Sequence, residues 1–355
     1  MGNTNNDGGV FTVSADLLYR QITEVFARWG MSAAHAATAA RIMVETDLAG
    51  IDSHGVGMLP HYQRGFAEGR LDPRAEPAIL RDTPAAALID SRHGIGHVAA
   101  EAAMSLAIRK AREGSIGIVA VTGSNHYGAA GWYARMAAEQ GCVGLSLTNA
   151  PTPFLVPVFG TERALGTNPI GFAAPGADPR RPVLLDMATT TVAYGKVAIA
   201  RRAGKPLPPG WAIAADGGPE TNAAVAAEAR ALAPLGGDRV HGGHKGYGLA
   251  LMVEILCATL TGARPGDETG HFFLAIDPGF FRDTQAFEAD LEALAARMRA
   301  NRPSDPAQPV LVPGDPEHDA VHRRRRTGIP LLPALVEEIR AVCSESGAPF
   351  LLEDG

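Results

Sequence analysis

A serine and a histidine stand side by side in the run Asp52-Ser53-His54-Gly55, and together they could carry proton-transfer chemistry. The run follows a predicted helix and lies at the mouth of a turn. A histidine in a loop can donate or accept a proton when a polar neighbour orients its ring, although adjacent residues cannot easily form a nucleophile and base pair. Taken alone, the tetrapeptide is more typical of a surface turn with an incidental histidine.

Two glycine-rich motifs could bind an anion at the start of a helix. The segment GSNHYGAA, 123–130, follows a buried-looking strand, and its small residues leave N–H groups free, although they would also serve as an ordinary cap. The loop GGHKGYG, 242–248, precedes a long apolar helix and carries Lys245, which could pair with a phosphate. Its order is not that of a Walker loop, and a flexible loop is the alternative.

An acid and a second glycine run lie next to predicted strands. Asp186 ends the strand-like run 183–185, where sheet enzymes place functional groups, or it caps a helix expected near Thr190. The run GIGHVA, 94–99, matches the dinucleotide-binding pattern G-x-G-x-x-A. That pattern also requires an acid at the end of the next strand, and this strand ends in Thr122-Gly123-Ser124 instead. The glycines therefore indicate a tight turn rather than a Rossmann site.

The elements that must position these motifs follow from the hydrophobic pattern. The first seventy residues predict helices, one capped by Ser14 and one beginning after Ser32. From residue 85 the chain alternates between strands and helices. The predicted strands are ALID, IGIVAV and VGLSLTN, and the helices between them are 97–112 and 132–139. This alternation predicts a sheet with helices packed on it. IGFAAP, VLLDMA and FFLAI are further predicted strands, and 204–219 is an irregular excursion. Further helices are predicted at 223–233, 249–260, 287–298 and 330–342. The run 313–317, PGDPE, predicts a turn, and the basic run 323–326 a solvated helix face.

Composition narrows the class of protein. A chain of 355 residues is long for one core and favours two domains with a cleft between them. Its net charge of −6 gives no attraction to nucleic acid or to anionic membranes. The three cysteines have no paired spacing, so they indicate neither a disulfide framework nor a thiolate metal site. With no apolar leader and no apolar run of about 20 residues, we expect a cytoplasmic protein.

Taken in order along the chain, the motifs resemble the malate/L-lactate dehydrogenase superfamily, which includes hydroxycarboxylate, sulfolactate, ureidoglycolate, diketogulonate and piperideine-carboxylate enzymes. The resemblance spans nearly the whole chain, and SHGVGMLPHY and PGDPE look most like the hydroxycarboxylate dehydrogenase branch. The matching segments are GIDSHGVGMLPHYQRG, GSNHYGAAGWYA, GTNPIGFAAP, LLDMATT, GGHKGYGLALMVEIL, FFLAIDP and PGDPE.

The resemblance implies a mixed α/β fold with two domains. A non-Rossmann cofactor domain over 81–319 would hold NAD, or alternatively NADP, on a mixed β-sheet flanked by helices. A helical domain would be built from both chain termini, 1–80 with 320–355. The protein would be a homodimer that interconverts a 2-oxoacid and a 2-hydroxyacid without a metal, with the cofactor near the subunit boundary.

The resemblance also assigns roles to individual residues. His54 would donate a proton to the substrate carbonyl oxygen as hydride arrives from the nicotinamide, with Ser53 and Asp186 orienting its ring. His126 would line the substrate site, and because some relatives are assigned it as the acid-base instead, the choice between the two histidines stays open. The residues expected to hold the cofactor are His126, Tyr127, Gly128, Ala129, Ala130, Leu184, Leu185, Asp186, Met187, Ala188, His244, Lys245, Gly314, Asp315, Pro316 and Glu317.

Two positions depart from the pattern of the superfamily. Several relatives carry an arginine four residues after the catalytic histidine, where it can clamp the substrate carboxylate, but this chain has Met58. Near the end of LSLTN, ureidoglycolate enzymes use a lysine that this chain lacks. We therefore expect residue 58 to face the cleft and to favour aromatic or branched 2-oxoacids. The carboxylate would then be bound by other groups, for which the candidates are His61, Tyr62, Arg64 and His126.

Two other classes of function compete with this interpretation. A metal-dependent hydrolase or lyase could use His54, His126, His241 and His244, but the last two lie in a glycine loop without an H-E-x-x-H motif. An inactive dinucleotide-binding protein is disfavoured because Ser53, His54, Asp186 and Lys245 are all present. The sequence leaves open the substrate, its stereochemistry and the choice of NAD or NADP.

Overall fold

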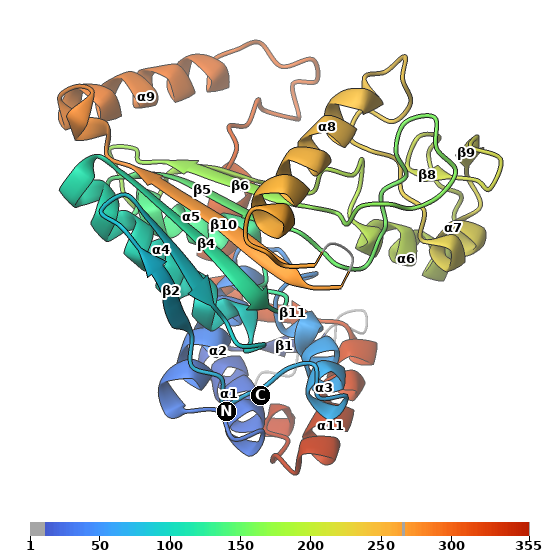
Figure 1. Cartoon of the computed structure of the whole chain (residues 1–355). Coiled ribbons are helices and arrows are strands. Elements are labelled where there is room, and N and C mark those ends of the chain that lie inside the picture. Colours follow the sequence, from blue (N-terminus) through green and yellow to red (C-terminus); the bar gives the residue numbers. More distant parts are fainter. Residues whose placement is uncertain (1–10, 265–266, 355) are drawn as a thin grey trace.

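A seven-stranded mixed sheet forms the centre of the computed structural model, which describes residues 11–264 and 267–354 (Figure 1). The strand order is β2-β3-β4-β10-β5-β6-β7; β3 and β4 are parallel, and all other neighbours are antiparallel. The strands are β2 (Ala78–Asp82), β3 (Ala86–Asp90), β4 (Ile116–Ser124), β5 (Val143–Thr148), β6 (Ile170–Ala174), β7 (Val183–Met187) and β10 (Thr269–Ile276). The strands expected from 85 to 188 and at 272–276 are confirmed.

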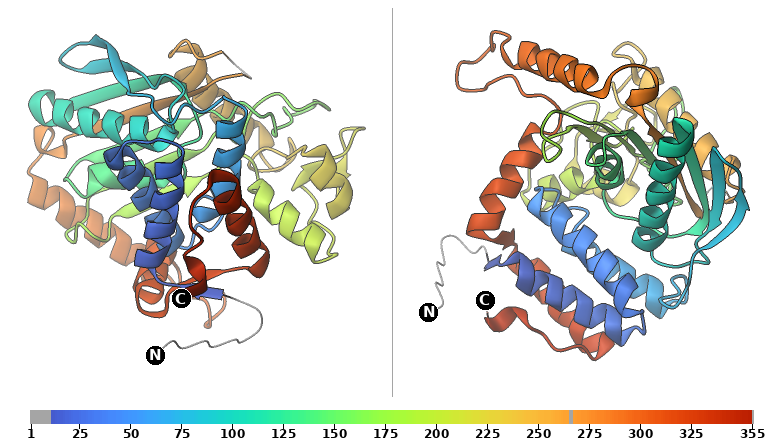
Figure 2. Two further views of the ribbon diagram at one scale, coloured as in Figure 1. Left: turned by 90° about the horizontal axis from the view of Figure 1, so that it is seen from below. Right: turned by 90° about the vertical axis from the view of Figure 1, so that its left-hand side faces the viewer.

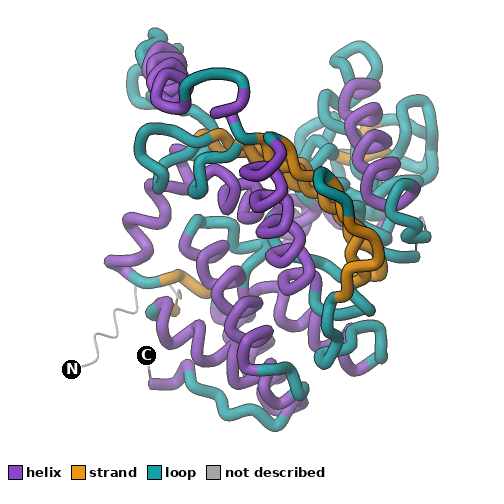
Figure 3. The backbone as a smooth tube through the Cα atoms, turned by 60° about the vertical axis from the view of Figure 1, so that its left-hand side comes forward, coloured by secondary structure: helices purple, strands orange, loops and turns teal. Residues whose placement is uncertain are grey.

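Two alanine-rich helices pack on this sheet (Figure 3). Helix α4 (Gly96–Gly114) contacts β4, and α5 (Ala130–Ala138) contacts β5 and β6. Small side chains let the helices lie close to the strands: a Cβ added to Gly117 would lie 2.0 Å from the Ala107 carbonyl oxygen. Gly96 is similar, since a Cβ there would lie 2.2 Å from the Asn125 carbonyl oxygen. This glycine therefore allows a loop to pack on the start of α4.

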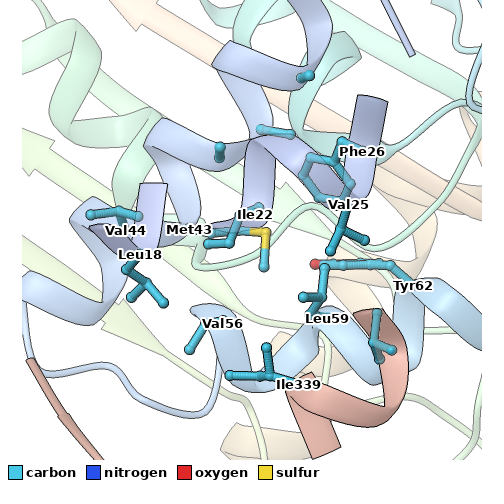
Figure 4. Packing of buried hydrophobic residues seen from close by; sticks show 14 of the residues in the cluster. Leu18, Ile22, Val25, Phe26, Met43, Val44, Val56, Leu59, Tyr62 and Ile339 are labelled. Atoms are coloured by element: carbon cyan, nitrogen blue, oxygen red, sulfur yellow. The ribbon is translucent and has the colours of Figure 1, made fainter. Parts of the chain in front are cut away.

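Helices from the two ends of the chain share one apolar core (Figures 2 and 4). These helices are α1 (Ala15–Arg28), α2 (Ala33–Leu48), α3 (Leu59–Ala67) and α11 (Pro333–Ser346). β1 (Phe11–Val13) also pairs with β11 (Ile329–Leu331). The expected starts of α1 and α2 are confirmed, since Ser14 and Ser32 cap them through their hydroxyl groups. The division into two domains at residues 80 and 320 stays a prediction.

The remaining elements lie around the sheet (Figure 1). On one side are α6 (Tyr194–Arg202), β8 (Ala212–Ile213), β9 (Pro219–Glu220), α7 (Ala223–Ala229) and α8 (Gly243–Glu254), which continues as a π-helical turn (Ile255–Thr259). α9 (Thr284–Arg299) projects from the opposite side, and α10 (Asp315–Thr327) follows it. Three short 3-10 turns, Val56–Met58 (η1), Pro278–Phe280 and Leu352–Asp354, complete the described elements. Within the described residues, no helix is long and apolar enough to cross a membrane.

The segment 313–327 corrects two sequence expectations. PGDPE was expected to form a turn, but Asp315, Pro316 and Glu317 form the first turn of α10, where proline is compatible with a helix because no N–H is needed there. The basic run lies on α10 and is exposed at Arg323, Arg325 and Arg326, as expected of a solvated helix face. Arg324 departs from this expectation, because it is half-buried and binds Asp52.

Candidate active site

The loop that carries His54 begins where α2 ends. Gly50 adopts a positive φ of 83° just after the helix and turns the chain away from its axis. The loop is then closed by a hydrogen bond from the His54 N–H to the Ile51 carbonyl oxygen, 3.0 Å long. The Ser53 hydroxyl oxygen lies 2.8 Å from His54 Nδ1, so Nε2 is the ring atom left to face a substrate. Burial lowers the pKa of His54 below its usual value, so its protonated form is a ready proton donor.

A second histidine lies opposite His54. The rings of His54 and His126 have centroids 5.5 Å apart and an interplanar angle of 28°. The Gly128 N–H donates to His126 Nδ1 over 3.3 Å, so Nδ1 is the unprotonated nitrogen and the Tyr62 hydroxyl, 2.7 Å away, donates to it as well. The ring proton of neutral His126 is therefore on Nε2. Burial, and then the neighbouring His54, hold the pKa of His126 well below its usual value.

This geometry distinguishes the two histidines. His126 is a fixed neutral donor through Nε2–H, because its Nδ1 accepts two hydrogen bonds. His54 has one ring nitrogen held by a hydroxyl group, which can donate or accept, so its ring can exist with either one or two protons. This arrangement allows His54 to gain or lose a proton and His126 to donate a hydrogen bond to an oxygen atom, and the choice of acid-base group between them stays a prediction.

A pocket is lined by Ile51 and Ala129, each three positions along the chain from one of the two histidines, although neither His54 nor His126 is among its lining residues. Its walls come from α2, α5, β7 and the first turns of α10. The pocket is lined by Glu45, Thr46, Ala49, Ile51, Ala129, Gly131, Trp132, Arg135, Arg180, Arg181, Pro182, Leu184, Asp186, Gly314, Glu317, His318 and Val321. Five of the sixteen residues expected to hold the cofactor thus line one pocket: Ala129, Leu184, Asp186, Gly314 and Glu317.

Asp186 lies in this pocket, but its hydrogen bond differs from the expected one. Its carboxylate accepts the N–H of Gly131, at the start of α5, over 2.8 Å, whereas the hydrogen bond described for the His54 ring goes to Ser53. The free N–H groups and the dipole at the start of a helix attract a carboxylate, which explains this choice. Burial nevertheless raises the pKa of Asp186 to about 6, with the Gly131 bond acting in the opposite direction. Asp186 therefore joins α5 to β7 rather than touching the His54 ring.

Two of the residues expected at the cofactor have side chains engaged in the fold. Asp315 accepts hydrogen bonds from Arg181, Arg299 and the N–H of Val312, and the Arg299 guanidinium holds its pKa well below the usual range. The Tyr127 hydroxyl lies 3.1 Å from the Ser146 hydroxyl, and its fully buried ring stacks on His271. Only the backbone of Tyr127 is left to contact a ligand.

The glycine loop of α8 lies apart from the pocket. His244 and Lys245 are exposed and are not among the residues that line it, and the Arg239 guanidinium lies 2.7 Å from His244 Nδ1. His241 in the same loop binds Asp238. The four histidines of the metal alternative thus lie on two separate parts of the chain. Among the described residues, no three His, Cys, Asp or Glu side chains are placed to hold one ion.

The expected substrate residues are only partly brought together. Tyr62 and His126 are in direct contact, and His61 lies 5.9 Å from His126 between ring centroids. Arg64 is exposed on α3, close enough to lower the pKa of His61 after burial has done so. Met58 is half-buried and packs against the helical core, and its role in the cleft stays a prediction. The sequence also missed Arg135, Arg181 and His318 in the pocket, for which no motif gave a signal.

Known proteins match this chain over most of its length. Residues 13–340 match the family model described as malate/L-lactate dehydrogenase. The chain is 38% identical to malate dehydrogenase of Pyrococcus horikoshii, over 97% of this chain and 98% of the relative. It is 35% identical to hydroxycarboxylate dehydrogenase B of Escherichia coli K12, over 89% of each. The crystal structure of malate dehydrogenase from Entamoeba histolytica superposes with a TM-score of 0.91 at 30% identity, covering 96% of this chain and 99% of that one.

Proposed function

Because the chain belongs to the malate/L-lactate dehydrogenase family, we propose that it interconverts a 2-oxoacid and a 2-hydroxyacid by hydride transfer with a nicotinamide cofactor. The observation that carries the proposal is the pair of facing histidines, 5.5 Å apart, in loops that also supply Ile51 and Ala129 to a pocket lined by α5 and α10. One histidine can transfer a proton and the other can hold an oxygen, as reduction of a carbonyl group requires.

The pocket fits a dinucleotide by the chemistry of its walls. The first turns of two helices, α5 and α10, line it, and the positive ends of their dipoles suit a pyrophosphate. At Gly314 the absence of a side chain matters: a Cβ there would lie 3.0 Å from the Pro182 carbonyl oxygen and 3.1 Å from Leu184. We therefore assign Ala129, Gly131, Leu184, Gly314 and Glu317 to the cofactor, in a domain that is not of the Rossmann type.

A nicotinamide cofactor held by the pocket residues would supply the hydride that the carbonyl carbon of the 2-oxoacid accepts in the reduction. His54 gives its Nε2 proton to the carbonyl oxygen, while the Ser53 hydroxyl keeps the ring in place through Nδ1. The Nε2–H of His126 donates a hydrogen bond to the same oxygen or to the carboxylate. In the reverse direction, neutral His54 accepts the hydroxyl proton.

The pH dependence should differ in sign between the two directions. The pKa of His54 is lowered by burial, so the protonated form needed for reduction is lost as pH rises through that pKa, whereas the neutral form needed for oxidation is retained. We expect kcat/KM for 2-oxoacid reduction to fall as pH rises through this lowered pKa, and kcat/KM for 2-hydroxyacid oxidation to rise over the same interval and then hold. Rate profiles from pH 5 to 9 measure both. A reduction rate that increases steadily to pH 9 would exclude His54 as the proton donor.

We propose NAD rather than NADP because of Glu317. Its carboxylate lines the pocket in the first turn of α10, and a carboxylate that can bind ribose hydroxyls repels a 2′-phosphate. Arg181 lines the same pocket, but its guanidinium is held by Asp315.

Glu317→Gln should weaken NADH binding by roughly 10-fold and reduce the difference between the Kd values for NADH and NADPH. Fluorescence titration with each cofactor measures this, with exposed Asp319→Asn as the control. Tighter binding of NADPH than NADH to the native protein would contradict the assignment.

A panel of 2-oxoacids tests the reaction and the substrate class. We expect oxidation of NADH with at least one 2-oxoacid and, since Met58 provides no guanidinium, higher efficiency with phenylpyruvate than with oxaloacetate. His61 and Arg64 are the groups we propose for the carboxylate. No oxidation of NADH or NADPH with any member of the panel would reject the proposed function.

We also propose a cytoplasmic homodimer. The three cysteines are buried and unpaired, as suits a reducing compartment. Several large apolar side chains are exposed on α8, on the π-helical turn and before α9, which suits a second copy of the chain as partner. They are Leu251, Met252, Ile255, Leu260, Phe280 and Phe281.

A further inference from the structure

An arginine far along the chain holds the loop that carries His54. Arg324, in the last turns of α10, has a side chain only 11% exposed. Its guanidinium binds both carboxylate oxygens of Asp52, one of them over 3.2 Å, and donates to the Asp47 carbonyl oxygen over 2.6 Å. That carbonyl lies in the last turn of α2 and also accepts the Gly50 N–H over 3.0 Å, so Arg324 adds a second hydrogen bond at the C-terminal end of the helix. Arg324 thus joins the end of α2 to the residue two positions before His54.

The other end of the loop, at Val56, is held by the side chain of Asp47. The Asp47 carboxylate accepts the N–H of Val56 over 2.8 Å, and Gly55 lies directly on that carboxylate. The segment 52–56 is therefore fixed on both sides of His54, by Arg324 at Asp52 and by Asp47 at Val56. A hydrogen bond to Ser53 orients the ring, but these two contacts place the backbone from which the ring projects.

The same helix that carries Arg324 also lines the pocket. Gly314, Glu317, His318 and Val321 line it from the beginning of α10, and Arg324 lies two turns beyond His318. A helix of 13 residues is about 20 Å long and behaves as one stiff element. α10 therefore connects the wall of the proposed cofactor pocket directly to the loop of the proposed acid-base group.

We propose that Arg324 is a positioning residue that holds the His54 loop in register with the cofactor pocket. The inference rests on the proposed role of His54. Arg325 does not contact the His54 loop in this way, since its side chain is 56% exposed and binds Glu45 at the surface. Arg326 is exposed in the same helix and provides a matched control.

Three variants test the proposal, with the 2-oxoacid that the panel identifies. Arg324→Gln should lower kcat by roughly 10- to 100-fold, because a displacement of about 1 Å in a reacting group can cost that much, while the Kd for NADH changes less than about 2-fold. Arg324→Lys should recover only part of the rate, since an ammonium group cannot bind both oxygens of Asp52 in a fork. Arg326→Gln should match the native protein in both quantities.

Two further measurements separate positioning from loss of folding and from failure of the proposed function. Asp52→Asn keeps Arg324 in place, and combining it with Arg324→Gln should add little further loss, because both remove one interaction. The imidazole NMR signals of His54, assigned by their absence in His54→Ala, should shift in Arg324→Gln and not in Arg326→Gln, with no turnover needed. A shift without any 2-oxoacid activity would reject the function and keep the positioning role. An unshifted signal, or a kcat equal to that of Arg326→Gln, would reject the positioning role.

Discussion

Replacing His54 with alanine should lower kcat for 2-oxoacid reduction by about 100-fold or more, while NADH still binds. The variant removes the only ring nitrogen that we assign to proton transfer, whereas the pocket residues of α5 and α10 are untouched. Steady-state rates give the loss, and fluorescence titration gives the Kd for NADH. His35→Ala provides the control, since its ring lies beside Glu76 on the helical part and should leave kcat unchanged.

The comparison with His126→Ala tests which histidine transfers the proton. His126 accepts two hydrogen bonds at Nδ1 and offers only a fixed Nε2–H, so its loss should raise KM for the 2-oxoacid and keep the pH slope of the native protein. His54→Ala should instead flatten that slope. If the slope disappears in His126→Ala and persists in His54→Ala, the two roles are reversed.

Gly55→Ala should be the most damaging single methyl group that can be added near the site. A Cβ at residue 55 would lie 2.0 Å from Asp47 Oδ1 and 2.2 Å from Asp47 Cγ, and Asp47 is buried with its carboxylate bonded to the Val56 N–H. Burial also raises the pKa of Asp47 to about 8, which favours its neutral form at pH 7, and the buried side chain has little room to move away from an added methyl group. We expect a loss of about 1–3 kcal/mol in the free energy of unfolding, as for other overpacked sites. The loop shift should also reduce kcat by roughly 100-fold.

The matched control is another glycine-to-alanine change in a helix. A Cβ at Gly248 in α8 meets nothing within 4 Å, so Gly248→Ala should stabilise the protein slightly and leave kcat unchanged. Denaturant unfolding and steady-state rates compare the two variants. Equal stability and activity in both would show that the contact between Gly55 and Asp47 is not tight in solution.

The elements that could be predicted from the sequence are those with a local pattern. Runs such as IGIVAV and VGLSLT are short, apolar and closed by polar residues, and they form β4 and β5. The insertion of β10 between these two strands could not be predicted, because it depends on pairing with residues more than 120 positions away. The start of α10 was missed as well, since its Pro and Gly suggested a turn, although the basic run 323–326 farther along was expected on a helix.

The site also has residues that could be predicted from the sequence and contacts that could not. Ser53, His54 and His126 carry recognisable residue types in recognisable order, and the structure brings the two histidines together. The hydrogen-bond partners of the acidic side chains could not be predicted. Asp186 binds the Gly131 N–H, and the acid that binds the His54 loop is Asp47, which no motif indicated. Arg324 looked like one of four surface arginines, because its partner Asp52 is 272 positions away.

The shared core of α1, α2, α3 and α11 has a consequence for synthesis on the ribosome. Residues 11–71 carry Leu18, Ile22 and Leu59 on their apolar faces, but Ile329 and Ile339, which complete that core, are made more than 250 residues later. At ordinary rates of translation, this interval is on the order of tens of seconds. Throughout it the segment with His54 lacks its packing partners and the arginine that holds it, so the loop reaches its final place only after the residues of α11 have been made.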